Sequence, residues 1–472
     1  MRDRFLWIGC LAYAGLFTWL GAIKYAAHRN LVDFGIFSQT VASAFGCFCN
    51  PIEGSHWAFH FSPILYVAGA AVALVHSPLT LVALQAIAGA LVAPPVYGLV
   101  RPRGGVGAAR LTAVVVWLYP ALAGLTFGDF HENGFAPAAV AWTLYSFDAG
   151  LVGWTLVAAA FALAVKEDQA IFLAVGGALG AWRYRGTPRG RVATIVGIAS
   201  IAVLVVFFAS VRPHMAASTG WQPWRFYAWQ PVAHGVAYEL GSRFGFLLLV
   251  FVPLLFLPFR SAMMWLAVAP LAEVLFSRMP TTFTLGTHYA GAWLGYVLVA
   301  FACAVRDLPV ARRRTALAAC IALCIVELAV ADPMHPGLNL RRPQARDAAL
   351  DGFLQTLPPD AAVATQEEAY THLALTDPNA ALLPETPSQP LASRFVLVDG
   401  DFPDSPRLQE YGRALARAVA QGRYVLVRRE GNIALYERSA PAASAARAGQ
   451  SSSARTMRCG AAHGDQRATC SA

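Results

Sequence analysis

Apolar runs close to 20 residues long recur from one end of this sequence to the other. A run of about that length crosses the hydrocarbon core of a bilayer as a single helix. The composition agrees, because 57% of the residues are hydrophobic and 13% are charged, whereas a typical soluble domain carries about 25% charged residues. The sequence therefore predicts an α-helical polytopic membrane protein.

The first apolar run begins almost at the first residue, and no Ala-x-Ala-like cleavage site follows it. We therefore interpret it as a retained helix and not as a secretory signal. The apolar segments are 5–23, 62–76, 79–100, 109–127, 134–147, 151–165, 170–182, 192–211, 244–259, 261–277, 290–305 and 315–331.

Arginine clusters between these segments predict the topology. They are "RDR" at the start, "RPRGGVGAAR", "RYRGTPRGR", Arg260 and "RDLPVARRR". Short arginine-rich loops stay in the cytoplasm. If each of the first three apolar segments crossed the membrane, "RPRGGVGAAR" would lie outside, so the simplest solution is that one of these segments does not cross. The segment 62–76 is short and begins with Ser-Pro, so we expect an outer interfacial or re-entrant helix there. About 11 spans then remain, with a cytoplasmic N-terminus.

The net charge of +9 has the same explanation. In a soluble protein it would suggest nucleic acid, but here the arginines lie between apolar runs and serve orientation. We expect no nucleic-acid partner. The predicted location is the inner (plasma) membrane.

The topology places nearly every acid and histidine of the membrane region on the outer face. The outer segments are 24–78, "GDFHEN" (128–133), "KEDQ" (166–169), 212–243 and 277–291. The topology was inferred from the arginine clusters alone and not from the acids and histidines. The grouping of the acids and histidines on one face therefore indicates where a functional site lies.

The character of the chain changes after residue 331. Strand-like "RFVLVDGD", a helical stretch from "SPRLQEYG", and two strands joined at Gly431-Asn432 predict a small extracytoplasmic α/β domain over 332–439. Residues 1–331 form the predicted transmembrane domain, and the Ala/Ser/Arg-rich 440–472 is predicted to be a disordered tail.

The cysteines show no metal-ligand spacing. Cys47 and Cys49 lie too close for an easy disulfide, and Cys459 and Cys470 could pair if the tail is oxidised. Three more cysteines in apolar segments are expected to be small core hydrophobes: Cys303, Cys320 and Cys324. No Walker loop, Rossmann fingerprint or nucleophile elbow is present, which argues against an ATP-driven pump or a nucleotide-sugar enzyme.

Asp33 stands in "HRNLVDFGIFSQT", among aromatic and aliphatic neighbours where the chain leaves the membrane. One interpretation is an N-cap of the helix that follows. The other is a partly desolvated general base, with His28 and Arg29 holding an anionic headgroup nearby. The two roles do not exclude each other.

The second and third outer loops carry further candidates. Asp129, His131 and Glu132 can bind a divalent metal or orient a hydroxyl, although a polar turn predicts the same residues. Lys166 is a phosphate-ligand candidate. Its neighbours Glu167 and Asp168 would hold it or a metal.

The remaining candidates lie on later segments. His288 and Tyr289 begin a span and would face the same cavity, and Glu273 is an acid within a span. The fourth loop carries Arg225 among tryptophans, which form either an interfacial aromatic belt or a platform for a sugar or an isoprenoid tail.

The arrangement resembles the GT-C class of membrane glycosyltransferases. That class carries an essential aspartate just after the first span, here Asp33 in "LVDFGIFSQ", then an interfacial helical stretch, here "HFSPILYVAGAAVALVH". A second acid follows the third span, here Asp129 in "FGDFHENG", and a small outer domain often ends the chain. Many members have an acidic pair in the first loop, whereas Phe34 follows Asp33 here.

More narrowly, five segments resemble a prokaryotic family of polytopic proteins of unknown function that is grouped with GT-C enzymes. These segments are "DFGIFSQ", "HFSPIL", "DFHENGFAP", "KEDQA" and "THYAG".

The resemblance implies transfer of a sugar from a polyprenyl-phosphate carrier to an envelope acceptor on the outer face. Asp33 would be the general base and Asp129 a metal ligand. The implied substrate-binding residues are Arg29, His60, His131, Glu132, Lys166, Glu167, Asp168, Arg225, His288 and Tyr289. The implied partners are the polyprenyl-phosphate-linked sugar and membrane lipid, and a divalent metal ion is the candidate cofactor. A transporter or lipid flippase, or a non-catalytic scaffold, are the alternatives.

Overall fold

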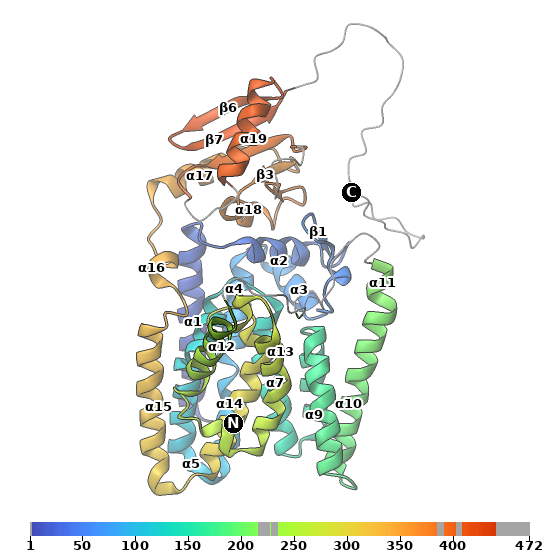
Figure 1. Cartoon of the computed structure of the whole chain (residues 1–472), viewed down its shortest axis with the longest axis vertical. Coiled ribbons are helices and arrows are strands. Elements are labelled where there is room, and N and C mark those ends of the chain that lie inside the picture. Colours follow the sequence, from blue (N-terminus) through green and yellow to red (C-terminus); the bar gives the residue numbers. More distant parts are fainter. Residues whose placement is uncertain (1, 216–226, 228–234, 385–390, 403–407, 440–472) are drawn as a thin grey trace. The chain divides into compact units, whose positions relative to one another are not determined.

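The computed structural model describes residues 2–215, 227, 235–384, 391–402 and 408–439 (Figure 1). The chain divides into two compact units. The helical unit comprises Met1–Ile23, Trp57–Ala71 and Leu79–Arg341, and the mixed unit comprises Lys24–His56, Val72–Pro78 and Arg342–Ala472.

The helical unit contains most of the α-helices, two of which, α1 and α3, end in segments of the mixed unit. Its helices are α1 (Arg4–Ala26), α3 (Leu65–Val75), α4 (Leu79–Ala90), α5 (Ala93–Leu118), α6 (Pro120–Phe127), α7 (Ala136–Asp148), α8 (Val152–Leu163), α9 (Glu167–Arg183), α10 (Pro188–Val206), α11 (Arg212–Met215), α12 (Gly235–Phe251), α13 (Val268–Phe276), α14 (Ala290–Asp307), α15 (Val310–Val330) and α16 (Pro336–Asn339). Short 3₁₀ turns occur at η1 (His56–Ala58), η2 (Glu132–Phe135), η5 (Leu257–Arg260), η6 (Ala262–Ala267) and η7 (Pro280–Phe283), and a π-turn at η3 (Phe207–Val211).

Four stretches in the described part of the chain are long and apolar enough to cross a membrane: Arg4–Ala26, Leu79–Leu118, Pro188–Met215 and Ala290–Asp307. Shorter apolar helices accompany them, and the count of about 11 spans stays a prediction. The segment expected not to cross, 62–76, contains the 11-residue helix α3, which is too short to span by itself.

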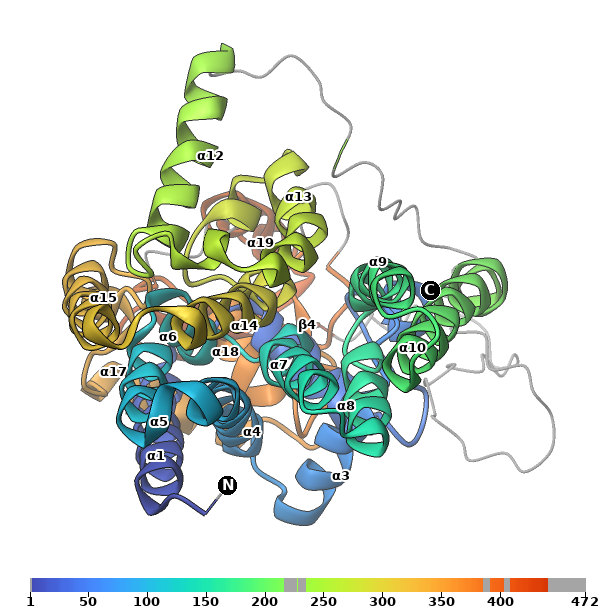
Figure 2. The same cartoon turned by 90° about the horizontal axis from the view of Figure 1, so that it is seen from below.

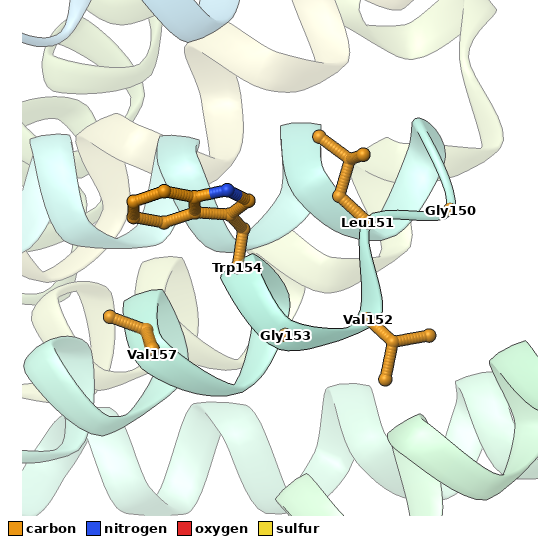
Figure 3. A pocket seen from close by; sticks show the side chains of 6 residues that line it. All are labelled: Gly150, Leu151, Val152, Gly153, Trp154 and Val157. Carbon is orange, nitrogen blue, oxygen red and sulfur yellow. The ribbon is translucent and has the colours of Figure 1, made fainter.

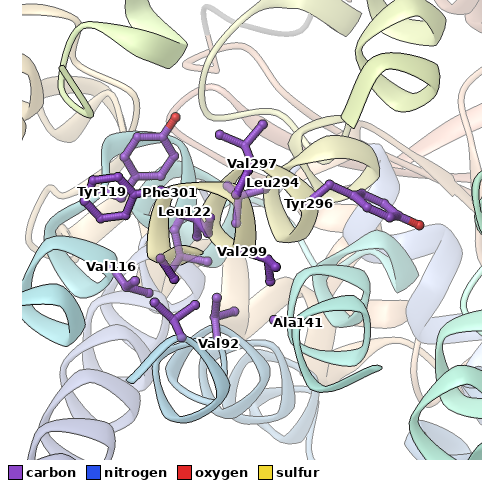
Figure 4. Packing of buried hydrophobic residues seen from close by; sticks show 14 of the residues in the cluster. Val92, Val116, Tyr119, Leu122, Ala141, Leu294, Tyr296, Val297, Val299 and Phe301 are labelled. Carbon is purple, nitrogen blue, oxygen red and sulfur yellow. The ribbon is translucent and has the colours of Figure 1, made fainter. Parts of the chain in front are cut away.

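α14 occupies the centre of the helical unit. Every residue from Ala290 to Val305 is buried, and a helix that is apolar on all sides belongs inside a larger assembly. Figure 4 shows Leu294 and Phe301 of α14 beside Tyr119 and Leu122 in one buried cluster. Seen from below, α9 and α10 lie side by side (Figure 2).

Three of the five arginine-rich segments contact one another or each other's neighbours in this unit: "RDR", "RPRGGVGAAR" and "RDLPVARRR". Arg110 pairs with Asp3 near the N-terminus at 2.9 Å. The buried Arg313 guanidinium donates to the carbonyl oxygens of Leu308 at 2.7 Å and of Arg103 at 3.2 Å. These three segments therefore lie close together, and the side of the membrane on which they lie stays a prediction.

The predicted loop 101–110 has a different local form. It lies within α5, where Gly105 has non-helical angles with φ of 76°. Two helical stretches thus meet at a glycine that can adopt a left-handed conformation without steric cost.

The mixed unit contains all the described strands. These are β1 (Cys49–Asn50), β2 (Gly54–Ser55), β3 (Val363–Thr365), β4 (Ala381–Leu382), β5 (Phe395–Asp399), β6 (Tyr424–Glu430) and β7 (Ile433–Arg438). Its helices are α2 (Val32–Ala42), α17 (Ala345–Thr356), α18 (Glu367–Leu373) and α19 (Leu408–Ala420). The main sheet has the order β4-β3-β5-β7-β6, with β3 parallel to both neighbours and the other pairs antiparallel.

The sheet is covered on both faces, because successive residues of β5 enter different cores. Leu397 packs with Phe353 of α17 and Tyr370 of α18, whereas Val396 packs with Leu415 of α19. The predicted small α/β fold is confirmed, and β6 and β7 form the expected hairpin at 431–432.

The first long loop also folds into the mixed unit. Gln39 of α2 donates to the carbonyl oxygens of Asp377 at 3.1 Å and Ala380 at 2.9 Å, and it accepts a hydrogen bond from the Tyr370 hydroxyl. At Gly35 a Cβ atom would lie 2.3 Å from Cε1 of Tyr370. α2, which carries Asp33, is therefore packed on α18.

The cysteine expectations have mixed outcomes. Cys47 and Cys49 form a disulfide, so the expectation that they lie too close was wrong. Phe48 between them has a positive φ of 48°, and the Cα atoms are 5.2 Å apart, which is within the range that a disulfide bridges. The three cysteines expected to be core hydrophobes are free and buried: Cys303, Cys320 and Cys324. Cys459 and Cys470 lie outside the described residues.

Candidate functional site

Asp33 is half-buried in the first turn of α2. The helix begins at Val32, its N-cap is Leu31, and no side chain caps it by a hydrogen bond. The expected N-cap role of Asp33 was therefore wrong, because the helix starts one residue before the acid. A carboxylate in the first turn still interacts favourably with the helix dipole. Arg29, which is buried, belongs to the same unit.

A cluster of charged side chains is buried in the helical unit. We call Glu132, Lys166, Glu167 and Asp168 the buried charge cluster; each is at most 9% exposed. The Nζ atom of Lys166 lies 3.5 Å from Oε1 of Glu132, and Nδ1 of His131 lies 2.9 Å from Oε2 of the same carboxylate. The second and third predicted outer loops therefore meet through Glu132.

The start of α9 explains how three charged residues fit at one helix junction. Lys166 is the N-cap in an extended conformation, and Glu167 and Asp168 occupy the first turn. Carboxylates are favoured there because the helix N-terminus is partially positive.

Glu167 joins the segment after η1 to this junction. Its Oε1 atom lies 2.8 Å from Nδ1 of His60, and its Oε2 atom accepts a hydrogen bond of 2.9 Å from the backbone N–H of Phe61. His60, predicted as a substrate ligand, is thus part of the same assembly.

The fifth loop reaches the site through stacked rings. The imidazole of His288 lies on that of His131 with ring centroids 3.8 Å apart and planes at 9°. Tyr289 follows directly and interacts electrostatically with Lys166. His288 and Tyr289, which were expected to face the same cavity as the loop acids, thus lie near His131 and Lys166.

The electrostatics favour a charged acid–lysine pair beside neutral imidazoles. Burial alone would raise the pKa of Glu132, but His131 and Lys166 hold this pKa well below its usual range. Burial opposes the charge on Lys166 in the same way, yet Glu132, Asp168 and Glu167 raise the pKa of its ammonium. Burial lowers the pKa of His131, against the effect of Glu132, and it lowers that of His288 well below its usual range.

Acceptor oxygens of the buried charge cluster have few partners. Among the described residues, Oδ1 of Asp168 has no hydrogen-bond partner, and the two oxygens of Glu132 have only their ion-pair contacts with Lys166 and His131. Buried carboxylate oxygens without donors are costly, so the site favours a ligand that brings hydroxyl or N–H groups.

Gln85 is a residue that the sequence reasoning missed. Its Nε2 atom donates to the carbonyl oxygens of Leu125 at 3.0 Å and Gly128 at 3.1 Å, and its Oε1 atom accepts from the backbone N–H of His131 at 3.0 Å. It thereby fixes the loop that carries Glu132. The sequence did contain a signal for it, because Gln85 is a polar amide residue within the apolar segment 79–100, where polar side chains usually have a partner.

Glu273 and Tyr227 extend the assembly. Glu273, the acid expected within a span, interacts electrostatically with Asp168 and Lys166, and it forms a side-chain hydrogen bond with Tyr227. Tyr227 belongs to the fourth loop, whose aromatic residues predict either an interfacial belt or a platform.

Other expected residues lie elsewhere. Arg225 lies outside the described residues. Asp129 is half-buried beside the site, and no group of three metal-ligating side chains within the described ranges includes it. Arg243, a further arginine of the fourth loop, donates to Glu239 and to the carbonyl oxygens of Leu275 and Ser277.

An open apolar groove of about 590 Å³ lies at the α7–α8 turn (Figure 3). Its lining residues are Gly150, Leu151, Val152, Gly153, Trp154 and Val157. None of them is a predicted site residue or a member of the buried charge cluster, so the groove is separate from the candidate site.

The family model described as "Predicted membrane protein (DUF2079)" matches residues 28–435. No curated protein sequence matches the chain.

Two solved structures of ArnT from Cupriavidus metallidurans share the fold at 12% sequence identity. The structure bound to undecaprenyl phosphate has a TM-score of 0.52 and covers 90% of this chain and 98% of that chain. The apo structure has a TM-score of 0.54, with 91% and 97% covered. An oligosaccharyltransferase from Archaeoglobus fulgidus, tethered with an acceptor peptide, matches at 12% identity with a TM-score of 0.38, covering 79% of this chain and 63% of that chain. The ArnT likeness confirms the expected GT-C-like fold of a multi-pass membrane protein.

Proposed function

The chain belongs to the DUF2079 family of predicted membrane proteins, and from that premise we propose that it is a membrane glycosyltransferase. It would transfer a sugar from a polyprenyl-phosphate carrier to an envelope acceptor on the outer face of the plasma membrane. The N-terminus would lie in the cytoplasm and the C-terminal α/β region outside it.

The observation that carries the proposal is the buried charge cluster on a GT-C-like fold. Oδ1 of Asp168 is a buried acceptor without a hydrogen-bond partner among the described residues, which suits a sugar hydroxyl. Lys166 is held in its charged form, which suits the carrier phosphate, whose charge grows as the glycosidic bond breaks. The ArnT neighbour bound to undecaprenyl phosphate supports a carrier lipid of this kind.

The proposed roles follow from these properties. Asp33 would take the proton of the acceptor hydroxyl while the oxygen of that hydroxyl attacks the anomeric carbon of the sugar. The bond between this carbon and the phosphate oxygen would break, and the polyprenyl phosphate would leave with the bonding electron pair. Arg29, Lys166 and Arg225 would contact the phosphate. The residues that would position the sugar and acceptor are His60, His131, Glu132, Glu167, Asp168, His288 and Tyr289.

A divalent ion at Asp129 would need further donors. Nδ1 of His131 accepts a hydrogen bond of 3.3 Å from the backbone N–H of Asn133, so its lone pair is already used. The donors beside Asp129 therefore do not form a ready metal site, and no step of this proposal passes through an ion there.

The test uses the purified full chain in nanodiscs with a panel of radiolabelled undecaprenyl-phosphate sugars. We expect sugar transfer to an envelope extract with one donor, accompanied by release of undecaprenyl phosphate. Lys166→Met should lose transfer and carrier binding, whereas Arg312→Gln, an exposed arginine of α15, should keep both. Movement of intact lipid-linked sugar across the bilayer without its cleavage would favour the flippase alternative.

A further inference from the structure

We propose that His28, Asp351 and His372 form a binding site for a divalent transition metal ion of the zinc class. All three residues belong to the mixed unit. The site is distinct from the buried charge cluster, and the proposal does not depend on glycosyl transfer.

The three side chains converge on a volume of suitable size. Each offers a ligand atom, and these atoms all lie within 4.8 Å of one another. Nε2 of His28 is 3.0 Å from Oδ1 of Asp351, and Nδ1 of His372 is 4.0 Å from the same oxygen. Ligand bonds of about 2.0–2.2 Å in a tetrahedral zinc site place ligand atoms roughly 3.3 Å apart, so the side chains must move closer, and at least one imidazole ring must turn, before all three bind one ion.

The hydrogen bond of His372 determines which of its nitrogens can bind a metal. Nε2 lies 3.0 Å from the carbonyl oxygen of Tyr25. A carbonyl only accepts, so Nε2 carries the proton, and in the neutral ring Nδ1 keeps its lone pair on the side of Asp351. Metal-binding histidines commonly donate their other N–H to a carbonyl in this way.

That arrangement is unfavourable without a cation. A lone pair on Nδ1 faces an anionic carboxylate, and the 4.0 Å separation is too long for a hydrogen bond from a protonated Nδ1. A metal ion between the two groups would satisfy both.

Stacking fixes both imidazole rings in the absence of an ion. A metal ion lies in the plane of each imidazole that binds it, so one ring must turn out of the stack when both bind the same ion. His372 is stacked between Tyr25 and His28, with centroid distances of 4.0 and 3.7 Å. His28 is fully buried and has a positive φ of 52°, a conformation that a non-glycine residue holds only when its surroundings enforce it. The side chain of Asp351 is 46% exposed, which leaves room for a water molecule as the fourth ligand.

A metal here would join segments that are far apart in sequence. His28 follows α1, whereas Asp351 lies on α17 and His372 on α18. Because an ion that binds only the folded state stabilises it, the metal would hold the segment leading to α2, and thus Asp33, on the C-terminal α/β region.

The experiment measures metal content and stability of the purified full chain. The protein is stripped with a chelator, loaded with Zn²⁺ alone, desalted and analysed by mass spectrometry of the metal. We expect about one zinc ion per chain, a lower unfolding temperature after chelation, and visible absorption of tetrahedral Co²⁺ when cobalt replaces zinc. His28→Ala, His372→Ala and Asp351→Asn should each weaken Zn²⁺ binding by more than about tenfold.

A matched control uses His335, whose Nδ1 lies 3.7 Å from Asp332 in a pair that belongs to no three-ligand group within the described ranges. His335→Ala should retain the ion. Asp351→Asn keeps the shape of a half-exposed side chain, so its folding can be verified by gel filtration. The proposal is overturned if the loaded wild-type chain holds no zinc, or if folded Asp351→Asn binds zinc as tightly as the wild-type chain.

Discussion

The imidazole of His288 stacks on that of His131 at 3.8 Å between ring centroids. Burial lowers the pKa of both rings below the ordinary value of 6.5, and that of His288 well below it. The unfolded chain takes up protons near pH 6.5 that the folded chain does not, so stability rises with pH through this window. We therefore expect full stability above pH 7 and a progressive loss as the pH falls below 6.5.

Unfolding temperatures of the detergent-solubilised chain between pH 8 and 5 measure this effect. His288→Phe keeps an aromatic ring on His131 but removes one titrating group, so its unfolding temperature should depend less steeply on pH. His214→Phe, at an exposed histidine of α11, should leave the slope unchanged. If the unfolding temperature of His288→Phe depends on pH as steeply as that of the unmodified chain, His288 does not contribute to this pH dependence.

The pair formed by Lys166 and Glu132 should show strong coupling. Lys166→Met leaves the fully buried Glu132 carboxylate without its cation, and such a loss typically costs ~3–5 kcal/mol. Glu132→Gln should also destabilise, because it leaves the lysine without this partner. The double variant should lose clearly less than the sum of the two single losses, as measured by denaturant unfolding. Additive losses would mean that the two groups do not interact.

Gly177 should be indispensable for the contact between α9 and α10. A Cβ atom there would lie 2.6 Å from Cα of Gly197 and 2.8 Å from the carbonyl oxygen of Ala193, which are backbone atoms that cannot rotate away. Gly177→Ala should therefore lower stability by about 1–3 kcal/mol.

Gly176→Ala is its matched control. The added Cβ would meet only Cδ2 of Leu266 at 3.6 Å, an ordinary contact, and alanine favours a helix. The control should be as stable as the unmodified chain or more so. Equal loss in both variants would show that backbone proximity is not the cause.

Segment positions were predictable where one physical signal dominated. Apolar runs placed α1, α10 and α14, and alternating strands with a glycine turn placed the β6–β7 hairpin. The start of α2 was not predictable to one residue, because Leu31 caps it without any side-chain hydrogen bond. Because the helix begins at Val32, Asp33 lies inside the first turn and is not the N-cap.

The site was predictable as a list of residues but not as a set of contacts. Glu132, Lys166 and Glu167 were predicted as site residues because they are charged and lie between apolar segments. Charged residues in such places need partners or a function. Which partners they find depends on pairings such as His60 with Glu167, 107 residues away, for which the sequence has no local signal. His372 was missed for the same reason, since its partner His28 is in a segment that looked like a membrane loop.

The proposed topology is tested by reporter fusions. Positions 105 and 187 lie at glycine turns, next to or at residues with positive φ, and position 310 begins α15, so insertions there spare helix interiors. Fusions at these three positions should report a cytoplasmic location, and one at position 400 an external one. An external signal at position 105 would reverse the assignment of the faces.

Asp33 is the proposed general base, and its substitution separates basicity from structure. Asp33→Asn keeps the side-chain shape and removes the basicity, so sugar transfer should fall by ~10²–10⁴-fold. Because Asp33 does not cap α2, only its interaction with the helix dipole is lost, about 0.3–1 kcal/mol. For the same reason Asp33→Ala should be nearly as stable as Asp33→Asn and equally inactive. Asp360→Asn, at a left-handed residue of the mixed unit where asparagine is well tolerated, serves as the control with normal transfer. If Asp33→Asn transfers sugar at a near-normal rate while remaining folded, the base must instead be sought at Asp129 or Glu167.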